Sequence, residues 1–376
     1  MDPRNTEPEE APEPEEQASP APSADDTAAT DTFPPEQAEA AGAALLSEKA
    51  ANKAAMRSAR QTYTTVGLAM CVLILASYLA SGLIQTIVYL VSPTLYESAV
   101  FLLIAGTVPM YLFGFLPAAL IIRRLPRASL TKNRVSVRMY LLFFVICYGM
   151  QVIGQILSSN TLNLLEWITG HSFDFQLNDT VAEAPVFVTI LFSVVLAPVI
   201  EELFFRKLLI DRLAPIGGFG AVLVSAIIFG LFHGNFYQAF YATGLGLIFG
   251  WIYLYSGGNI LYSISLHVLF NLLGGVLVPK LTEILGIGTE QGITGDIIAA
   301  HPVAFLLYLL YFAFLLTALI ITWICLAVKK RNIRESLDAY PSPITGDGSR
   351  IGAVFSNPGV PLMGLLFLIM FWLSAQ

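Results

Sequence analysis

Charged side chains are scarce in this sequence. Only 12% of the 376 residues are Asp, Glu, Lys or Arg, whereas 56% are hydrophobic, and the mean hydropathy is +0.69. Soluble domains carry roughly 25% charged residues, so this composition excludes a soluble globular protein. We expect an integral membrane protein that has the lipid bilayer as its surroundings and no nucleic-acid partner.

Cysteine is nearly absent as well. Cys71, Cys147 and Cys325 all fall within apolar runs, and their spacing favours neither a disulfide framework nor a metal site. We interpret them as small apolar packing residues. The acidic amino terminus has no apolar core region, so a secretory signal is not expected there.

Long apolar runs, by contrast, are abundant. Each is long enough to cross roughly 30 Å of hydrocarbon as a helix that rises about 1.5 Å per residue. The pattern predicts an all-α fold, a polytopic bundle of about eight to nine transmembrane helices. The predicted spans are 64–91, 98–122, 138–159, 185–205, 219–235, 236–256, 259–278, 303–328 and 359–375.

The composition changes along the chain. Residues 1–40 are rich in Pro, Ala, Glu and Asp and hold almost no large apolar side chains, so they are expected to be disordered. The stretch 37–60 turns to Ala, Leu, Glu and Lys, which favour a water-exposed helix that leads into the first span. The predicted divisions are a disordered acidic cytoplasmic tail with a short Ala-rich helix at 1–60, accessory transmembrane helices at 61–160, a core at 185–278, and C-terminal transmembrane helices with a cytoplasmic loop at 279–376.

The distribution of Lys and Arg predicts the orientation. With the amino terminus inside and nine crossings, the clusters of basic residues fall inside and only Lys280 falls outside. The predicted outer loop 161–184 carries four acidic residues and no Lys or Arg. The excess of basic residues on one side predicts a cytoplasmic amino terminus, and we expect the chain in a bacterial plasma membrane.

A few polar and ionisable residues lie inside the predicted core. Such a side chain near the bilayer centre costs roughly 2.5–3.5 kcal/mol, so a cluster of them indicates a functional site. The candidate residues are Glu201, Glu202, Arg206, His233, His267 and Asn271.

The two glutamates have different expected roles, because adjacent residues of a helix point about 100° apart. Glu202 and Arg206 are four residues apart with the acid first, the better order for a helical ion pair. This pair would keep Glu202 charged and leave Glu201 free to act on water. Pro198 removes one backbone hydrogen bond just before them and favours a kink.

Helix spacing predicts that Glu201 and His233 lie at similar depth. If residues 214–218 form the turn between two antiparallel helices, Glu201 lies 13 residues before the turn and His233 lies 15 residues after it. Both side chains would then be about 20 Å from the turn. This coincidence indicates that the acid and the imidazole face each other.

The predicted span 259–278 contributes a polar stripe, because Asn259, Ser263, His267 and Asn271 are spaced four apart. A polar stripe within a membrane must face protein or water. We expect Glu201 to act as general base on a water that the two imidazoles orient or charge, while Asn271 donates a hydrogen bond to an oxyanion.

Three motifs in this order resemble a known family. Glu-Glu-x-x-x-Arg at 201–206, Phe-x-x-x-His at 229–233 and His-x-x-x-Asn at 267–271 are similar to those of the CPBP family, the CAAX proteases and bacteriocin-processing enzymes that include type II CAAX prenyl endopeptidases. The resemblance covers 185–278, which would be the catalytic core. It implies an intramembrane endopeptidase that has a peptide or protein substrate at the membrane, prenylated in eukaryotic members, and a catalytic Glu at Glu201.

The metal requirement stays open at the level of sequence. Family members look glutamate-dependent but are often classed as metalloproteases. Two histidines and a carboxylate are able to ligate a divalent metal such as zinc, yet the sequence has no His-Glu-x-x-His helix. The metal ligands and the cofactor are therefore unknown.

Two further alternatives and one conflict also stay open. A proton-coupled transporter uses buried Glu and His, and a non-catalytic scaffold or immunity protein keeps the fold without the chemistry. The conflict is that His233 falls near the outer end of its span, whereas Arg206 should mark the inner surface. Either the two helices project past that surface, or the span before His233 stops short beside a water-filled cavity.

Overall fold

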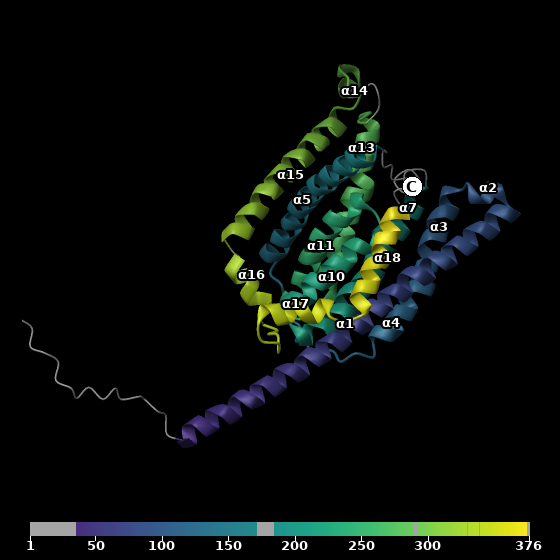
Figure 1. Ribbon diagram of the computed structural model, residues 1–376. Coiled ribbons are helices and arrows are strands. Elements are labelled where there is room, and N and C mark those ends of the chain that lie inside the picture. The colour runs from purple at the N-terminus through teal and green to yellow at the C-terminus, as the bar shows by residue number, and fades with distance from the viewer. Residues whose placement is uncertain (1–34, 171–183, 289–291, 329, 338, 374–376) are drawn as a thin grey trace, which may run out of the picture. The chain divides into compact units, whose positions relative to one another are not determined.

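A computed structural model describes residues 35–170, 184–288, 292–328, 330–337 and 339–373 (Figure 1). Every regular element in these ranges is a helix, so the all-α prediction is confirmed. The chain divides into two units, Met1–Lys49 and Ala50–Gln376. The elements are α1 (Pro35–Val91), α2 (Pro93–Tyr96), α3 (Ala99–Pro109), η1 (Met110–Phe115), α4 (Leu116–Ile122), α5 (Val137–Thr169), α7 (Val186–Thr189), η2 (Ile190–Leu196), α8 (Ala197–Glu202), η3 (Leu203–Ile210), α9 (Asp211–Leu213), η4 (Ala214–Ile216), α10 (Gly218–Phe232), α11 (Phe236–Tyr255), α12 (Ile260–Leu272), η5 (Leu273–Leu277), α13 (Val278–Ile284), α14 (Gly295–Ala300), α15 (Pro302–Val328), α16 (Lys330–Leu337), α17 (Asp347–Phe355) and α18 (Gly359–Leu373).

The number of membrane-spanning helices is lower than the sequence predicted. In the described ranges six helical stretches are long and apolar enough to cross a bilayer, or seven if the bent pair α17–α18, with its angle of 61°, forms one span. The chain is an integral membrane protein of this helical kind. The six stretches are Glu39–Val91, Ala99–Ile122, Val137–Thr169, Val186–Ile216, Ile260–Ile284 and Pro302–Val328.

Two predicted spans, 219–235 and 236–256, form helices that do not meet these criteria. Their counterparts are α10, which has only 15 residues and so a length of roughly 22 Å, and α11, which is long enough but carries four tyrosines and a glutamine. Both pack inside the bundle, because α11 lies between α5 and α10 (Figure 1). Protein surrounds much of these two helices where lipid was expected.

The first helix, α1, is continuous over 57 residues. The expected water-exposed helix at 37–60 and the first span at 64–91 are therefore one element. The expected disorder of residues 1–40 falls almost wholly outside the described residues.

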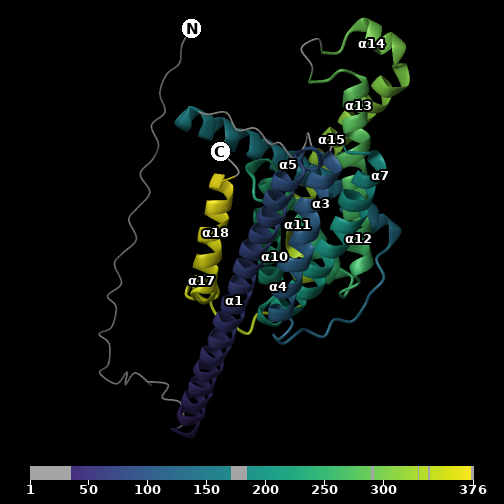
Figure 2. The same ribbon diagram turned by 90° about the vertical axis from the view of Figure 1, so that its right-hand side faces the viewer.

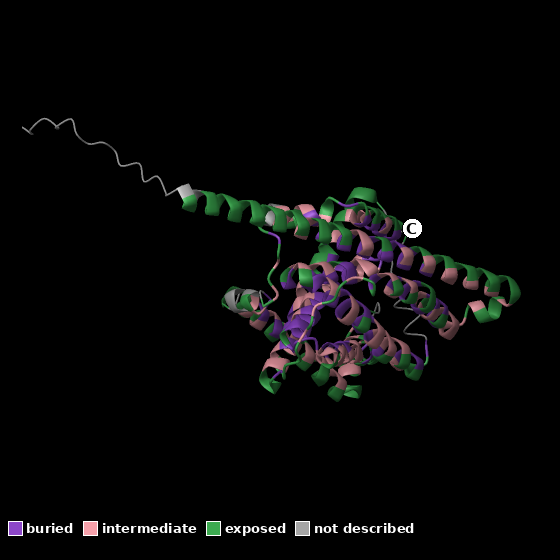
Figure 3. Ribbon diagram, turned by 90° about the horizontal axis from the view of Figure 1, so that it is seen from below, coloured by how far each residue is buried: buried purple, intermediate pink, exposed green. Residues whose placement is uncertain are grey.

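Glycines allow the central helices to pack closely. A Cβ atom added to Gly246 of α11 would lie 2.9 Å from the Cα atom of Ala226 of α10. On the other side of α11, a Cβ atom at Gly154 of α5 would overlap the backbone of Tyr241. Small residues are the usual means by which helices approach in membranes. Figure 2 shows the resulting bundle, and Figure 3 shows that buried residues lie on the inner faces of its helices.

The outer faces of several helices are apolar and exposed. Only 6% of the most apolar window of α15 is buried, and most of its leucines, together with Phe312 and Trp323, are exposed. Such a surface needs a hydrocarbon environment. Contact with the hydrocarbon of a lipid bilayer therefore explains why these outer faces are apolar.

Prolines within the membrane helices follow a common pattern. Each of three prolines lies two residues after the end of a π-helical segment. A π turn shifts backbone pairing from i+4 to i+5 and so helps a helix to continue past a residue that has no N–H group. The three pairs are η1 with Pro117, η2 with Pro198 and η5 with Pro279.

Candidate active site

The predicted site residues come from three neighbouring parts of the bundle. Glu201 and Glu202 end α8, Arg206 lies in η3, His233 caps the carboxyl end of α10, and His267 lies in α12. Four of these five are buried, with exposed fractions of 8% for Glu201, 4% for His267, and 0% for Glu202 and Arg206. A cluster of buried ionisable groups needs internal partners.

Glu202 is the most completely paired of them. Its Oε2 atom lies 3.2 Å from Nε of Arg206, so the expected ion pair is present. Its Oε1 atom lies 3.1 Å from Nδ1 of His267. Glu202 therefore joins η3 to α12 and sets the orientation of the imidazole.

Glu201 lies on the opposite side of the same imidazole. Its Oε2 atom is 3.8 Å from Nε2 of His267, which is too long for a direct hydrogen bond. In the described part of the chain no hydrogen-bond partner of Glu201 is found. The carboxylate is buried and lies close to an imidazole.

Two aromatic rings contact both His267 and Arg206. The His267 ring stacks on Phe249 at 4.9 Å and meets the edge of Phe229 at 5.8 Å. The Arg206 guanidinium lies 4.5 Å from the Phe229 centroid and 5.5 Å from that of Phe249. A cation over a ring face is attracted by the ring quadrupole. Phe229 was part of a sequence motif without an assigned role, and nothing in the sequence singled out Phe249.

Arg206 lies in the interior of the bundle. It is fully buried, and the helical stretch continues beyond it to Ile216. The helix before His233, α10, has 15 residues. The depth of the site relative to the membrane, with its two alternatives, stays a prediction. The Glu202 carboxylate and two aromatic rings compensate the buried charge of Arg206 in the interior.

His233 is half-buried at the carboxyl end of α10. Its Nδ1 atom lies 2.8 Å from the carbonyl oxygen of Phe229, one turn earlier. A carbonyl oxygen only accepts, so we assign the proton to Nδ1 and leave Nε2 as an acceptor. The His233 ring lies 5.0 Å from the Phe229 ring, so Phe229 contacts both imidazoles.

Asn271 has a structural partner on η2. Its Nδ2 atom donates to the carbonyl oxygen of Ser193 at 2.8 Å. The N–H of Ala197 donates to Phe192 in the i+5 pattern, so the Ser193 carbonyl would next pair with Pro198, which has no N–H. Asn271 supplies the missing donor and keeps a second N–H for another acceptor.

The donor set does not fit a metal ion. Both ring nitrogens of His267 face carboxylates, and Glu202 is shared between that ring and Arg206. Among the described residues no group of three His, Cys, Asp or Glu side chains is placed to hold a metal. We therefore derive no step through a metal.

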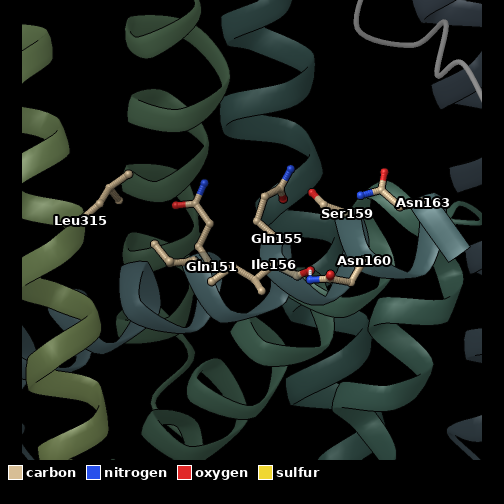
Figure 4. A pocket seen from close by; sticks show the side chains of 8 residues that line it. Gln151, Gln155, Ile156, Ser159, Asn160, Asn163 and Leu315 are labelled. Carbon is tan, nitrogen blue, oxygen red and sulfur yellow. Dashed lines mark hydrogen bonds between the residues drawn. The ribbon is translucent and has the colours of Figure 1, made fainter.

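A polar hollow that the sequence reading missed lies on α5. It has a volume of 440 Å³, and Figure 4 shows Gln151, Gln155, Ser159 and Asn163 on one side of the helix. Their spacing of four residues was the available signal. The Oε1 atom of Gln151 is buried without a hydrogen-bond partner among described residues. The full lining is Gln151, Val152, Gln155, Ile156, Ser159, Asn160, Asn163 and Leu315.

A comparison with protein families supports the reading of the motifs. Residues 183–273 match the family model described as "Type II CAAX prenyl endopeptidase Rce1-like". The matched segment, about a quarter of the chain, contains all six predicted site residues. No curated protein and no solved structure matches this chain. The resemblance inferred from the three motifs is thus confirmed: residues 183–273 match the Rce1-like family of type II CAAX prenyl endopeptidases.

Proposed function

We propose that this chain is an intramembrane endopeptidase that hydrolyses a peptide bond of a membrane-associated substrate, with Glu201 as the general base. The observation that carries the proposal is the buried Glu201 carboxylate, which has no hydrogen-bond partner in the described ranges and lies 3.8 Å from an imidazole that Glu202 holds in place. The support for a CAAX-type substrate is the family match alone.

The proposed reaction needs one water and no other reagent. Glu201 takes a proton from the water while the water oxygen bonds to the peptide carbonyl carbon. The carbon–nitrogen bond of the tetrahedral intermediate then breaks, and Glu201 returns the proton to the leaving nitrogen. The products are a new carboxyl terminus and a new amino terminus.

His267 and Glu202 would act together. Glu202 accepts a hydrogen bond from Nδ1–H of His267, which leaves Nε2 toward Glu201 and the water. A carboxylate that fixes the tautomer and orientation of a catalytic imidazole is a recurring arrangement. In this proposal Glu202 positions the imidazole and Glu201 does the proton transfer.

The remaining polar groups would stabilise the intermediate. The second N–H of Asn271 is free of Ser193 and is the proposed oxyanion donor. His233 presents Nε2 as an acceptor and would orient the water or the substrate N–H. Arg206 supplies positive charge to Glu202 without facing the water itself.

The test is cleavage of a farnesylated peptide that ends in a CAAX tetrapeptide, beside its unlipidated counterpart, by purified full-length protein. Glu201→Gln keeps the shape of the side chain, so we expect normal folding. The rate of peptide cleavage should fall by a factor of at least about 100. Glu283→Gln removes a carboxylate from an exposed position and should leave the rate unchanged. Full cleavage by Glu201→Gln would refute the role of Glu201.

The same protein samples separate the alternatives. A transporter or a scaffold would cleave neither peptide, even as wild type. Elemental analysis of the active wild-type protein would determine whether a metal accompanies the activity, and a stoichiometric zinc would contradict a mechanism based on Glu201 alone.

A further inference from the structure

The segment between α4 and α5 carries an unbalanced charge. We call residues 123–138 the basic strap (Figure 2). No acidic residue occurs between Glu97 and Glu166, so nothing on the strap neutralises its cations. The basic residues are Arg123, Arg124, Arg127, Lys132, Arg134 and Arg138.

The strap is fixed to the catalytic half of the bundle. The N–H of Ala128 donates to the carbonyl oxygen of Asp211 at 2.7 Å, and that of Asn133 donates to Ser256 at 2.8 Å. Gly257, which has a φ of +61°, provides a third anchor, because a Cβ atom there would overlap a carbonyl group of the strap. These contacts hold the strap over the ends of α9 and α11.

A pocket of 240 Å³ lies where the strap meets η3 and α9. It is small enough for a single phosphate-sized group with part of its attached chain. The lining residues are Arg127, Ala128, Ser129, Leu130, Lys207 and Asp211.

Asp211, the acidic residue in the lining of this pocket, already has a partner at each carboxylate oxygen. Oδ2 of Asp211 lies 2.9 Å from Nζ of Lys207, and Oδ1 accepts a hydrogen bond of 2.5 Å from the Tyr253 hydroxyl. Arg127 adds a positive charge to the lining, and Arg212 directly follows Asp211 in the chain. The pocket lining therefore has an excess of one positive charge. A buried Nε atom of the neighbouring Arg212 lacks a hydrogen-bond partner among described residues.

We propose that this pocket binds the phosphate of an anionic phospholipid headgroup. The strap joins the ends of two membrane-spanning stretches, Ala99–Ile122 and Val137–Thr169, so it lies at the membrane boundary where headgroups are concentrated. Basic pockets between membrane helices are known to take such headgroups. A net anionic lipid fits the excess charge better than a zwitterionic one.

A headgroup in this pocket would affect η3, the helical segment that carries Arg206. Lys207 and Arg206 are neighbours on η3, and Asp211 follows that segment directly. A headgroup that bridges Arg127 and Lys207 would tie the strap to η3 and stiffen the helix that positions Arg206. This binding does not depend on whether Glu201 cleaves peptides.

The test is native mass spectrometry of the delipidated full-length protein in detergent, titrated with phosphatidylglycerol or phosphatidylcholine. We expect wild-type protein to retain phosphatidylglycerol preferentially, and Arg127→Gln to bind it about fivefold more weakly, as the loss of one cationic contact implies. Arg138→Gln removes the same charge from the strap outside the pocket and should bind like wild type.

Three outcomes would overturn the proposal. Equal retention of the two lipids by wild-type protein would remove the preference for a net anionic headgroup. An equal effect of Arg127→Gln and Arg138→Gln would show general electrostatic attraction without a site. Binding of inorganic phosphate with no retained phosphatidylglycerol would identify a soluble anion as the ligand. A rise in melting temperature with phosphatidylglycerol, absent in Arg127→Gln, would support the proposal independently.

Discussion

At the scale of single residues, the site depends on how one buried cation is compensated. Arg206 is fully buried, and none of its three guanidinium nitrogens has a hydrogen-bond partner in the described ranges. Its charge is balanced by Glu202 and by the faces of Phe229 and Phe249. The guanidinium is thus held by attraction to rings and one carboxylate, and each neighbour also contacts His267.

Replacement of this cation should therefore affect folding before it affects chemistry. Arg206→Ala leaves the Glu202 carboxylate buried and without its ion-pair partner, which typically costs about 3–5 kcal/mol. We expect a lower yield of monodisperse protein and a lower melting temperature in detergent. Lys280→Ala, which removes a half-exposed cation, is the matched control. Equal melting temperatures for the two variants would contradict this account.

At the scale of elements, π-helical segments let prolines lie within the membrane helices. One of these prolines, Pro198, makes a backbone carbonyl of η2 depend on a side chain of α12 for its hydrogen bond. The Ser193 carbonyl would pair with the missing N–H of Pro198, and Asn271 of α12 donates to it instead. The position of α12 relative to η2 is thereby linked to a proline. The same asparagine is the proposed oxyanion donor, so structure and chemistry share one side chain.

A double-mutant cycle measures that dependence. Asn271→Ala should destabilise the protein by about 1–3 kcal/mol, because it leaves the Ser193 carbonyl without its donor. In a Pro198→Ala background the restored N–H supplies a donor, so the same replacement should cost less. The readout is thermal unfolding of the four proteins. Strictly additive effects would contradict the proposed pairing.

Another element contact lies outside the segment that matches the family. Gly67 of α1 and Gly359 of α18 meet so closely that a Cβ atom on either would overlap the other helix. α18 in turn contacts the turn after His233, because the rings of Phe371 and Phe236 lie 4.7 Å apart. The last helix therefore packs on a part of the candidate site.

Gly67→Val should separate α1 from α18 and lower the melting temperature. Gly82→Val makes the same change on α1 where no atom lies within 4 Å of the added Cβ atom, and it should have little effect. If the contact also supports the turn after His233, Gly67→Val should reduce peptide cleavage as well. Indistinguishable unfolding curves for the two variants would refute the importance of this contact.

At the scale of the whole molecule, the matched segment 183–273 is embedded in the rest of Ala50–Gln376. Its helix α11 packs closely on α5, where Gly154 meets Tyr241, and α18 covers the turn after His233. Helices outside the family match thus supply part of the packing that holds the site.

A fragment limited to 183–273 should therefore fail to fold. We expect it to aggregate on extraction into detergent, whereas Ala50–Gln376 should stay monodisperse, since the longer chain keeps α5 and α18. Size-exclusion chromatography of both chains tests this. A monodisperse, helical 183–273 fragment would show that the outer helices are dispensable.

The sequence was informative wherever the signal is local. Apolar length predicted helices at all nine positions, and four-residue spacing predicted the Glu202–Arg206 pair. The turn assumed at 214–218 is present as η4 and Gly217. It was less informative where neighbours decide the environment. The burial of Arg206 and the protein-packed positions of α10 and α11 required knowledge of which helices surround them.

Sequence alone determined the helical membrane class, the set of ionisable residues and the family that 183–273 matches, because hydrophobic length and motif spacing are properties of short stretches. Only the tertiary structure decided that His267 faces both glutamates, that Phe249 stacks on it and that Asn271 pairs with Ser193. Each of these contacts joins helices that are far apart in the chain. Their partners are fixed by packing, which no local pattern specifies.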